Sequence, residues 1–237
     1  MLSQTSISII SISDIRMKET IVALKKSFKL VKSSETILFT SQSVRLNKYE
    51  KNIINIIKIP EIKSIKDYSN FIIYELYKYI KTSHVLIVQW DGYIINKNKW
   101  DLNFFNYDYI GAPFIPRSLD EQYSRDQKGA FYVIGNGGFS LRSRRLLEAP
   151  SKFKLVDDPN FTNMHEDGFF CVYHRSFLES KGFIWAPFYI AKEFSIESPL
   201  CLNDLKELPF GFHGKKMIYI KKFIKPLILF FKILKLF

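Results

Sequence analysis

Cysteine is scarce in this sequence, with only Cys171 and Cys201 among 237 residues. Neither cysteine has CxxC spacing or histidine-rich surroundings, which argues against a disulfide framework or a zinc site and favours a reducing compartment. The first residues lack a basic region followed by a continuous apolar run, so we expect no signal peptide and a cytoplasmic protein. No glycine-rich phosphate loop follows the first predicted strand, which argues against a dinucleotide-binding or P-loop fold.

Positive charge is abundant, with a net charge of +12. Such a balance is compatible with nucleic acid, an anionic membrane or a phosphorylated small ligand as the partner. The aromatic residues are not interleaved with basic residues on a strand face, and lysines cluster near the C-terminus, so we expect no nucleic-acid partner. The 47% of hydrophobic residues is enough for a real core.

Short apolar runs alternate with segments of helical periodicity through the first half of the chain, which predicts an α/β sheet. The predicted strands are 6–13, 37–40, 53–59 and 85–89, and the predicted helices are 18–30 and 68–80, the second capped by Asp67. In the second half we predict strands at 107–114, 135–142, 185–188 and 194–197, and helical segments at 100–105, 144–148 and 169–180. The polar stretch from Ile115 to Lys128 is either a mobile lid over a site or an inert surface loop.

The run His84–Tyr93 is the centre of this pattern. Its apolar residues are typical of a central strand buried on both faces, and they end at Gln89-Trp90-Asp91-Gly92. Ligands of open α/β sheets bind beyond the carboxyl ends of such strands, so Asp91 is expected at a ligand or metal site. The alternative is that Asp91 and Gly92 only form a turn.

Three later stretches also have a functional and a structural interpretation. Gly135, Asn136, Gly137 and Gly138 allow positive φ values and close backbone approach to a ligand, or form a hairpin turn. Glu166 and Asp167 have a functional role, or they only cap the helix that follows and complement its dipole. His213, in the sequence Phe210-Gly211-Phe212-His213-Gly214, is a ligand-facing histidine or a structural one.

Taken together, these stretches resemble a bacterial family of glycosyltransferase-like proteins, known mainly as a domain of unknown function found near polysaccharide genes. The matching segments run in order through nearly the whole chain: Asp67–Ser69, Leu86–Tyr93, Tyr107–Pro113, Gly135–Ser143, Glu166-Asp167 and Phe210–His213. More distantly, the order of motifs is similar to fringe and β-1,3-galactosyltransferases of the GT-A type. The resemblance implies a GT-A-like, Rossmann-like mixed sheet flanked by helices in a single α/β domain.

The resemblance also implies roles for individual residues. Enzymes of this fold hold a divalent metal with an Asp-x-Asp motif, and the aligned triplet here is Gln89-Trp90-Asp91, with glutamine in place of the first acid. Asp91 and His213 would then bind Mn²⁺ or Mg²⁺. Asp167, with Glu166 beside it, would match the catalytic base. The remaining donor-binding positions implied are Asp14, Arg16, Gln89, Trp90, Asn136, Gly137 and Gly138.

The C-terminal residues 215–237 predict a basic amphipathic helix outside a domain spanning 1–214. Stepping 100° per residue gathers Lys221, Lys222, Lys225, Lys232 and Lys235 opposite an apolar side of phenylalanine, leucine and isoleucine residues. Such helices lie in anionic membrane interfaces, and the apolar runs are far too short to span a bilayer. The alternative is a helix packed on its own domain or on a second copy.

These expectations combine into one functional hypothesis. The chain is expected to move a sugar from a nucleotide-sugar donor, a UDP-sugar, to a surface-polysaccharide or lipid-linked glycan acceptor. One base and one metal suit an inverting reaction at the inner face of the cell membrane. The competing hypothesis is a non-catalytic glycan- or nucleotide-binding protein that retains the fold, because Gln89 departs from the metal motif.

Overall fold

The computed structural model describes residues 6–114, 124–126, 128–157, 165–197 and 207–219. The described strands form a six-stranded sheet in the order β3-β2-β1-β4-β7-β6 and a three-stranded sheet in the order β5-β9-β8. The strands are β1 (Ile7–Ile12), β2 (Glu35–Thr40), β3 (Asn55–Lys58), β4 (His84–Ile87), β5 (Tyr93–Ile94), β6 (Tyr109–Phe114), β7 (Ile134–Ser143), β8 (Ser195–Ile196) and β9 (Gly211–Phe212). The α-helices are α1 (Met17–Leu30), α2 (Lys48–Ile53), α3 (Ile65–Asn70), α4 (Arg144–Phe153), α5 (Glu166–Gly168), α6 (Arg175–Ser180) and α7 (Phe188–Phe194).

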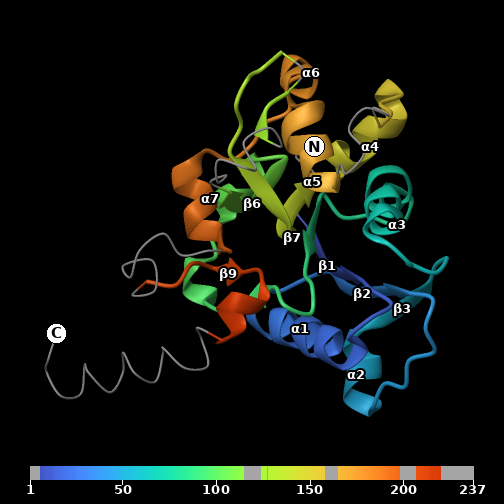
Figure 1. Cartoon of the computed structure of the whole chain (residues 1–237). Helices are drawn as coiled ribbons and strands as arrows, with labels where there is room; N and C mark the ends of the chain where they lie inside the picture. The colour runs from blue at the N-terminus through green and yellow to red at the C-terminus, as the bar shows by residue number, and fades with distance from the viewer. Residues whose placement is uncertain (1–5, 115–123, 127, 158–164, 198–206, 220–237) are drawn as a thin grey trace, which may run out of the picture.

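The large sheet is mixed and covered on both faces, as the sequence predicts. Strands β1 to β4 are parallel, whereas β7 runs antiparallel to both β4 and β6. Every residue of β1 is buried. Its adjacent residues Ile9 and Ile10 belong to two different hydrophobic clusters, because successive side chains of a strand point to opposite faces of the sheet. Helix α1 covers one face through Leu24, while α4 and the turns after α3 cover the other (Figure 1).

The predicted helix 68–80 begins earlier and changes its pitch. Ser64, not Asp67, is the N-cap, since its hydroxyl accepts a hydrogen bond from the Asp67 amide at 3.1 Å. The helix then widens into a π-helical turn, η1 (Phe71–Glu75), and ends in a 3₁₀ turn, η2 (Leu76–Lys78). The wider turn accompanies the burial of three consecutive residues at its start, Phe71 to Ile73.

Other predicted elements divide into confirmed and corrected ones. The predicted helical segment 144–148 is confirmed within α4, which Ser143 caps by accepting a hydrogen bond from the Leu146 amide at 3.1 Å. The predicted helix 169–180 is instead a chain of α5, a π-helical turn η6 (Phe169–Tyr173) and α6. The predicted strand 185–188 is wrong: only Trp185 bridges to the sheet, and Pro187 is the N-cap of α7. Helical turn 100–105 is a 3₁₀ segment, η4 (Leu102–Asn106), and a shorter one, η3 (Lys97–Lys99), precedes it.

The small sheet brings the end of the domain back beside the carboxyl end of β4. Strand β9 pairs antiparallel with β5 and parallel with β8. The ring centroids of Tyr93 and Phe212 lie 4.7 Å apart. The residues after Gly214 are helical to 219, and Met217 is buried against this sheet. Residues 220–237 and most of the predicted lid 115–128 lie outside the described residues. Among the helices described, no segment combines the length and apolarity needed to cross a membrane.

Candidate active site

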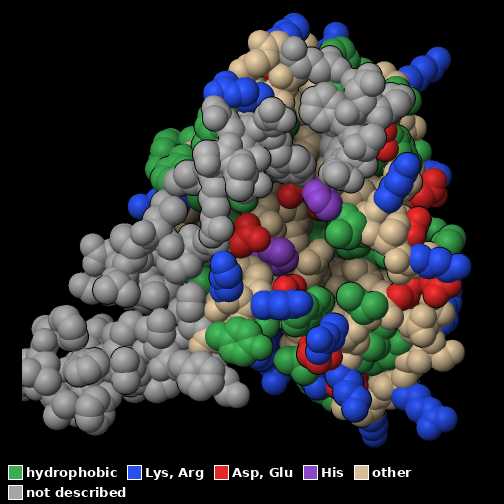
Figure 2. Space-filling model, viewed as in Figure 1, with side chains coloured by type: hydrophobic (Ala, Val, Ile, Leu, Met, Phe, Trp, Pro, Cys, Tyr) green, Lys and Arg blue, Asp and Glu red, His purple; other side chains and the backbone are tan. Residues whose placement is uncertain are grey.

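A cavity of about 580 Å³ opens where the carboxyl ends of β1 and β4 meet β7 and α5. Figure 2 shows two histidines and several acidic side chains gathered in the hollow of this face. Nine of the predicted site residues line it: Asp14, Gln89, Trp90, Asn136, Gly137, Gly138, Glu166, Asp167 and His213. The sequence did not single out Ser11, Ser64, Tyr68 or His165, which line the same cavity.

Asp91 lies in the tight turn that the sequence predicts after β4. Gln89 and Gly92 close this turn by exchanging two backbone hydrogen bonds, of 2.9 and 3.0 Å. The Asp91 side chain is buried, and its Oδ1 lies 3.7 Å from His213 Nε2 and has no hydrogen-bond partner among the residues that the structure describes. A buried carboxylate oxygen without a donor is costly, which indicates that the site is built to receive a cation or a donor from a ligand.

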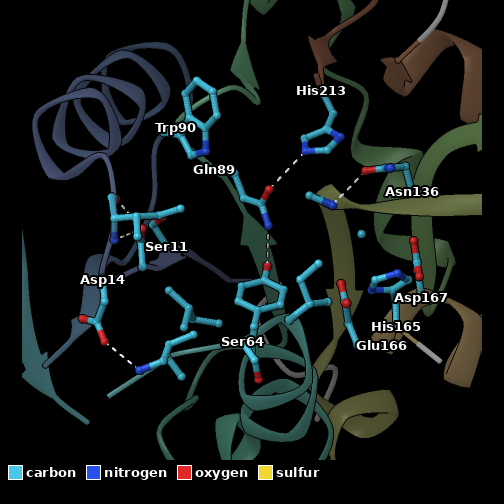
Figure 3. Close-up of a pocket in the computed structure, with 18 of the residues that line it drawn as sticks. Ser11, Asp14, Ser64, Gln89, Trp90, Asn136, His165, Glu166, Asp167 and His213 are labelled. Carbon is cyan, nitrogen blue, oxygen red and sulfur yellow. Dashed lines mark hydrogen bonds between the residues drawn. The ribbon is translucent and has the colours of Figure 1, made fainter. Parts of the chain in front are cut away.

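Gln89 connects His213 with Tyr68 of α3 through its side-chain amide. Its Oε1 lies 3.1 Å from His213 Nε2, and its Nε2 donates a hydrogen bond of 2.9 Å to the hydroxyl of Tyr68. Figure 3 shows Gln89 in the middle of the cavity, with His213 above it and Glu166 and Asp167 at the lower right of the view. The amide is therefore held in one orientation, with its oxygen toward the imidazole.

These three side chains fit a divalent cation. A carboxylate oxygen, an amide oxygen and an imidazole nitrogen are ligands that Mn²⁺ accepts. Metal–ligand distances of about 2.1 Å allow two ligand atoms to lie up to roughly 4.2 Å apart, so the 3.7 Å between Asp91 and His213 is compatible with a shared ion. No group of three His, Cys, Asp or Glu residues that could hold a metal occurs in the described part of the chain. Gln89 Oε1, 3.1 Å from His213 Nε2, is the further oxygen beside this acid and histidine.

Two glycines of β7 make room for this arrangement. A Cβ on Gly138 would lie 2.1 Å from His213 Nε2, and a Cβ on Gly137 would lie 2.0 Å from Glu166 Oε1. Neither glycine has a positive φ, because the described positive-φ glycines are 129, 182 and 214. The sequence-based expectation of positive φ or a hairpin turn is therefore wrong, and close approach is the reason for glycine here, with functional side chains as the neighbours.

The imidazole of His213 is embedded among acids. Burial lowers the pKa of His213, but the hydrogen bond to Glu197 and the charges of Asp91 and Glu197 outweigh burial and raise this pKa above its ordinary value. The Nδ1 atom lies 3.4 Å from Glu197 Oε1, on the side of the ring opposite to Gln89. A protonated His213 thus stabilises the metal-free fold below pH about 6.5, and this stabilisation is lost as the pH rises through the raised pKa.

Replacing Glu197 with glutamine is expected to lower the pKa of His213, because the hydrogen bond to the Glu197 carboxylate is the largest of the effects that raise this pKa. Proton NMR titration of the imidazole in metal-free protein measures the midpoint directly. Glu193→Gln is the matched control, since Glu193 pairs with Lys99 at 2.8 Å instead. Equal midpoints in wild type and Glu197→Gln would contradict this account of the site.

Glu166 and Asp167 occupy neighbouring positions but different environments. Glu166 is buried and its Oε1 accepts a hydrogen bond of 2.9 Å from Arg142 Nη2, while Arg142 is itself fully buried. Burial and the charge of Asp167 raise the pKa of Glu166 against the opposing effect of Arg142. Asp167 is only partly buried, lines the cavity, and accepts a hydrogen bond of 2.8 Å from the Gly168 amide.

Asp14 and Arg16 form the rim next to β1. The Asp14 carboxylate accepts hydrogen bonds from Thr40, from the amide and hydroxyl of Ser41, and from the Ile62 amide at 2.7 Å. Burial alone would raise the pKa of Asp14, but these hydrogen bonds together lower it. Asp14 therefore fastens three segments together at the edge of the cavity, and the nucleotide contact that the resemblance implies for it stays a prediction.

A cationic pair lies over the indole of Trp90. The Arg16 guanidinium is 5.2 Å from the ring centroid and Lys215 Nζ is 5.4 Å from it. Arg16 precedes α1 in the left-handed region, with φ of 50°. Lys215 was not singled out in the sequence as a site residue, and only its contact with Trp90 reveals it. The cavity thus combines an acidic interior with a basic rim, which suits a metal-bound diphosphate.

Comparisons with known proteins agree with this fold. A glycosyltransferase involved in the glycosylation of the major capsid of PBCV-1 matches with a TM-score of 0.53 and 16% identity, over 89% of this chain and 93% of that one. The mannosyltransferase PcManGT from Pyrobaculum calidifontis, solved with GDP-Man and Mn²⁺, matches with a TM-score of 0.39 and 10% identity, over 62% of this chain. This chain spans about half of that mannosyltransferase, covering 47% of it.

The structural similarity shows the GT-A-like glycosyltransferase fold that the sequence predicts. No curated protein matches the sequence. A family model described as "Protein of unknown function (DUF5672)" matches residues 51–213, which is more than half of the chain and includes β4, β7, α5 and His213. The chain therefore belongs to the DUF5672 family.

Proposed function

We propose that this chain is a glycosyltransferase that uses a divalent metal and a nucleotide-sugar donor. One observation carries the proposal: Gln89, His213 and Asp167 line a single cavity, and the buried carboxylate of Asp91 lies 3.7 Å from His213 Nε2. The cavity volume of about 580 Å³ is within the usual range for small-ligand sites. Its position beyond the carboxyl ends of parallel strands is the usual one in such sheets.

Each side chain has a place in the reaction. Asp167 takes the proton of an acceptor hydroxyl while that oxygen bonds to the anomeric carbon of the donor sugar. The bond from the anomeric carbon to the phosphate oxygen breaks, and a nucleoside diphosphate leaves. A cation held by Asp91, Gln89 and His213 would neutralise charge on the diphosphate. Arg16 and Lys215 would attract the same phosphates at the rim, and Glu166 would position Asp167.

The donor is proposed to be a UDP-sugar, and the acceptor a surface polysaccharide or lipid-linked glycan. Attack by the acceptor on the face opposite to the leaving diphosphate, with a single base, would invert the anomeric configuration. Support comes from Asp167, a partly exposed carboxylate that lines the same cavity as Gln89 and His213. The fold of the PBCV-1 glycosyltransferase supports the reaction class and does not specify the sugar.

Calorimetric titration with nucleoside diphosphates, with and without Mn²⁺, tests the donor site. We expect one nucleotide to bind only with Mn²⁺, and Asp91→Asn to weaken that binding at least tenfold because it removes the unpaired carboxylate charge. Asp101→Asn, at an exposed cap outside the cavity, is expected to bind like wild type. Binding that is absent, independent of Mn²⁺, or unaffected by Asp91→Asn would contradict the proposal.

A membrane contact is the second part of the proposed function. We propose that residues 221–237 bind the anionic inner face of the cell membrane, placing the site near lipid-linked acceptors. Support comes from the basic amphipathic pattern of residues 215–237, of which residues 215–219 are helical with Met217 buried against the small sheet. Co-sedimentation with anionic vesicles should fall at least tenfold on deletion of residues 221–237, and unchanged co-sedimentation would refute the membrane contact.

A further inference from the structure

A second, smaller cavity of about 210 Å³ lies between β6–β7 and the helices α6–α7. Its wall is rich in aromatic rings, contributed by Phe131, Tyr132, Trp185 and Phe188. Phe131 and Phe188 are 46% and 43% exposed, so much of their ring surface faces solvent. Aromatic rings gain stability when a partner covers them. Large rings that stay exposed to solvent around a cavity are therefore typical of a binding surface. We call this site the aromatic cavity.

One cationic side chain, that of Arg175, lies among these rings. The Arg175 guanidinium lies 4.5 Å from the centroid of Trp185 and 5.4 Å from that of Tyr132, and its Nε donates a 2.6 Å hydrogen bond to Glu179. Among the described residues, no acceptor is recorded for the two terminal nitrogens of Arg175. The guanidinium is thus held flat by two rings while several of its donors stay available for a ligand.

Two elements each contribute residues to both the aromatic cavity and the candidate active site. On β7, Gly135 lines the aromatic cavity and the next residue, Asn136, lines the larger one. The chain from Asp167 runs through α5, η6 and α6 to Arg175, a path of roughly 12 Å at helical rise. Figure 1 shows α5 and α6 following each other beside β7.

We infer that the aromatic cavity binds the acceptor saccharide at a unit beyond the one that reacts. This inference rests on the proposed function for its place in the reaction, although saccharide binding itself does not require transfer. Sugar rings present apolar C–H faces, which pack on aromatic rings, and hydroxyl or carboxylate oxygens, which accept hydrogen bonds from a guanidinium. A purely apolar occupant fits less well, because it would bury the donors of Arg175 without acceptors.

The test is saccharide binding by the full chain without nucleotide or metal. An array of immobilised oligosaccharides, both neutral and uronic-acid-containing, identifies a bound chain, and saturation-transfer NMR then measures its affinity. We expect Phe188→Ala and Arg175→Gln each to weaken binding at least tenfold. A greater loss in Arg175→Gln for acidic chains than for neutral ones would show that the guanidinium binds a carboxylate, whereas equal losses would show that it binds hydroxyls.

Two matched controls separate the aromatic cavity from general surface effects. Tyr189→Ala removes the neighbouring ring, which is 66% exposed and does not line the cavity. Arg144→Gln removes an arginine that pairs with a glutamate four residues later, as Arg175 does, but on α4. Both controls should bind the saccharide like wild type.

Three results would overturn the inference: no saccharide retained by wild type, binding unaffected by Phe188→Ala and Arg175→Gln, or equal losses in the controls. Any of these together with Mn²⁺-dependent nucleotide binding would leave the proposed function standing. Saccharide binding that depends on Phe188 and Arg175, in a chain that binds no nucleotide, would instead refute the transferase and retain the aromatic cavity.

Discussion

Asp167→Asn is expected to lower the rate of sugar transfer by about 10²- to 10⁴-fold, the usual contribution of a general base. Asparagine has nearly the same shape as aspartate but cannot accept the proton of the acceptor hydroxyl. The Gly168 amide that donates to Asp167 Oδ1 can donate equally to the asparagine oxygen, so the start of α5 should remain in place. Donor affinity should therefore stay within about twofold of wild type, which follows from the transition-state role of a base.

The measurement is release of nucleoside diphosphate in the presence of acceptor, with calorimetric donor affinity from the same preparation. Asp101→Asn serves again as the matched replacement outside the cavity and should transfer at the wild-type rate. Transfer by Asp167→Asn at an undiminished rate would remove Asp167 from the mechanism. Loss of donor binding together with transfer would indicate a binding role in place of a catalytic one.

Glu166→Gln is expected to destabilise the fold by about 3–5 kcal/mol, because it leaves the fully buried Arg142 with an uncompensated charge. Within the described part of the chain, Arg142 already has one buried terminal nitrogen without a partner, and its Nε donates a hydrogen bond to the Ser140 hydroxyl. The guanidinium lies 4.9 Å from the Tyr109 centroid, and an aromatic ring compensates a cation far less than a carboxylate does. Urea unfolding measures the loss.

The exposed pair of Arg144 and Glu148 provides the control for this experiment. Glu148→Gln changes the same atoms in a partner that is 2.9 Å from an arginine, but at the surface, and should cost no more than about 0.5 kcal/mol. Replacing both members of the buried pair, as Arg142→Met with Glu166→Leu, should cost less than Glu166→Gln alone. Equal costs for Glu166→Gln and Glu148→Gln would show that the buried pair is not a major determinant of stability.

The sheet was predictable from the sequence because its strands are short apolar runs. Residues 7–12 and 84–87 have no polar face to satisfy in water, so only a strand covered on both sides accommodates them. The cap at Ser143 was predictable because a hydroxyl before an amphipathic helix has one favourable local use. These are local signals, and neighbouring residues suffice to interpret them.

The failures in the fold arise where tertiary burial overrides helical pitch. The segments 71–75 and 169–173 each begin with at least three consecutive buried residues, a pattern that no α-helical face can bury, and both become π-helical turns. The predicted strand at 185–188 fails because Pro187 sets a helix start that its apolar composition conceals. Neither outcome can be obtained from periodicity alone.

For the site, the sequence suggested which residues gather but not what they contact. The pairing of Arg142 with Glu166 joins residues on a strand and a distant helix, and no spacing rule connects them. The same holds for Lys215 and Trp90, which meet only because the chain after β9 returns to the turn after β4. Gly137 and Gly138 were identifiable as necessary, whereas the side chains that require them were not.

The small sheet also determines when the site can exist during folding. Strand β9, which delivers His213, pairs with β5 from the opposite half of the chain and with only one other short strand. Pairings between distant segments are entropically expensive to close, and two-residue strands return little for that closure. The six-stranded sheet can therefore be complete while His213 is still far from Asp91. We therefore expect ligand-binding competence to form late in folding and to be lost early when the chain begins to open.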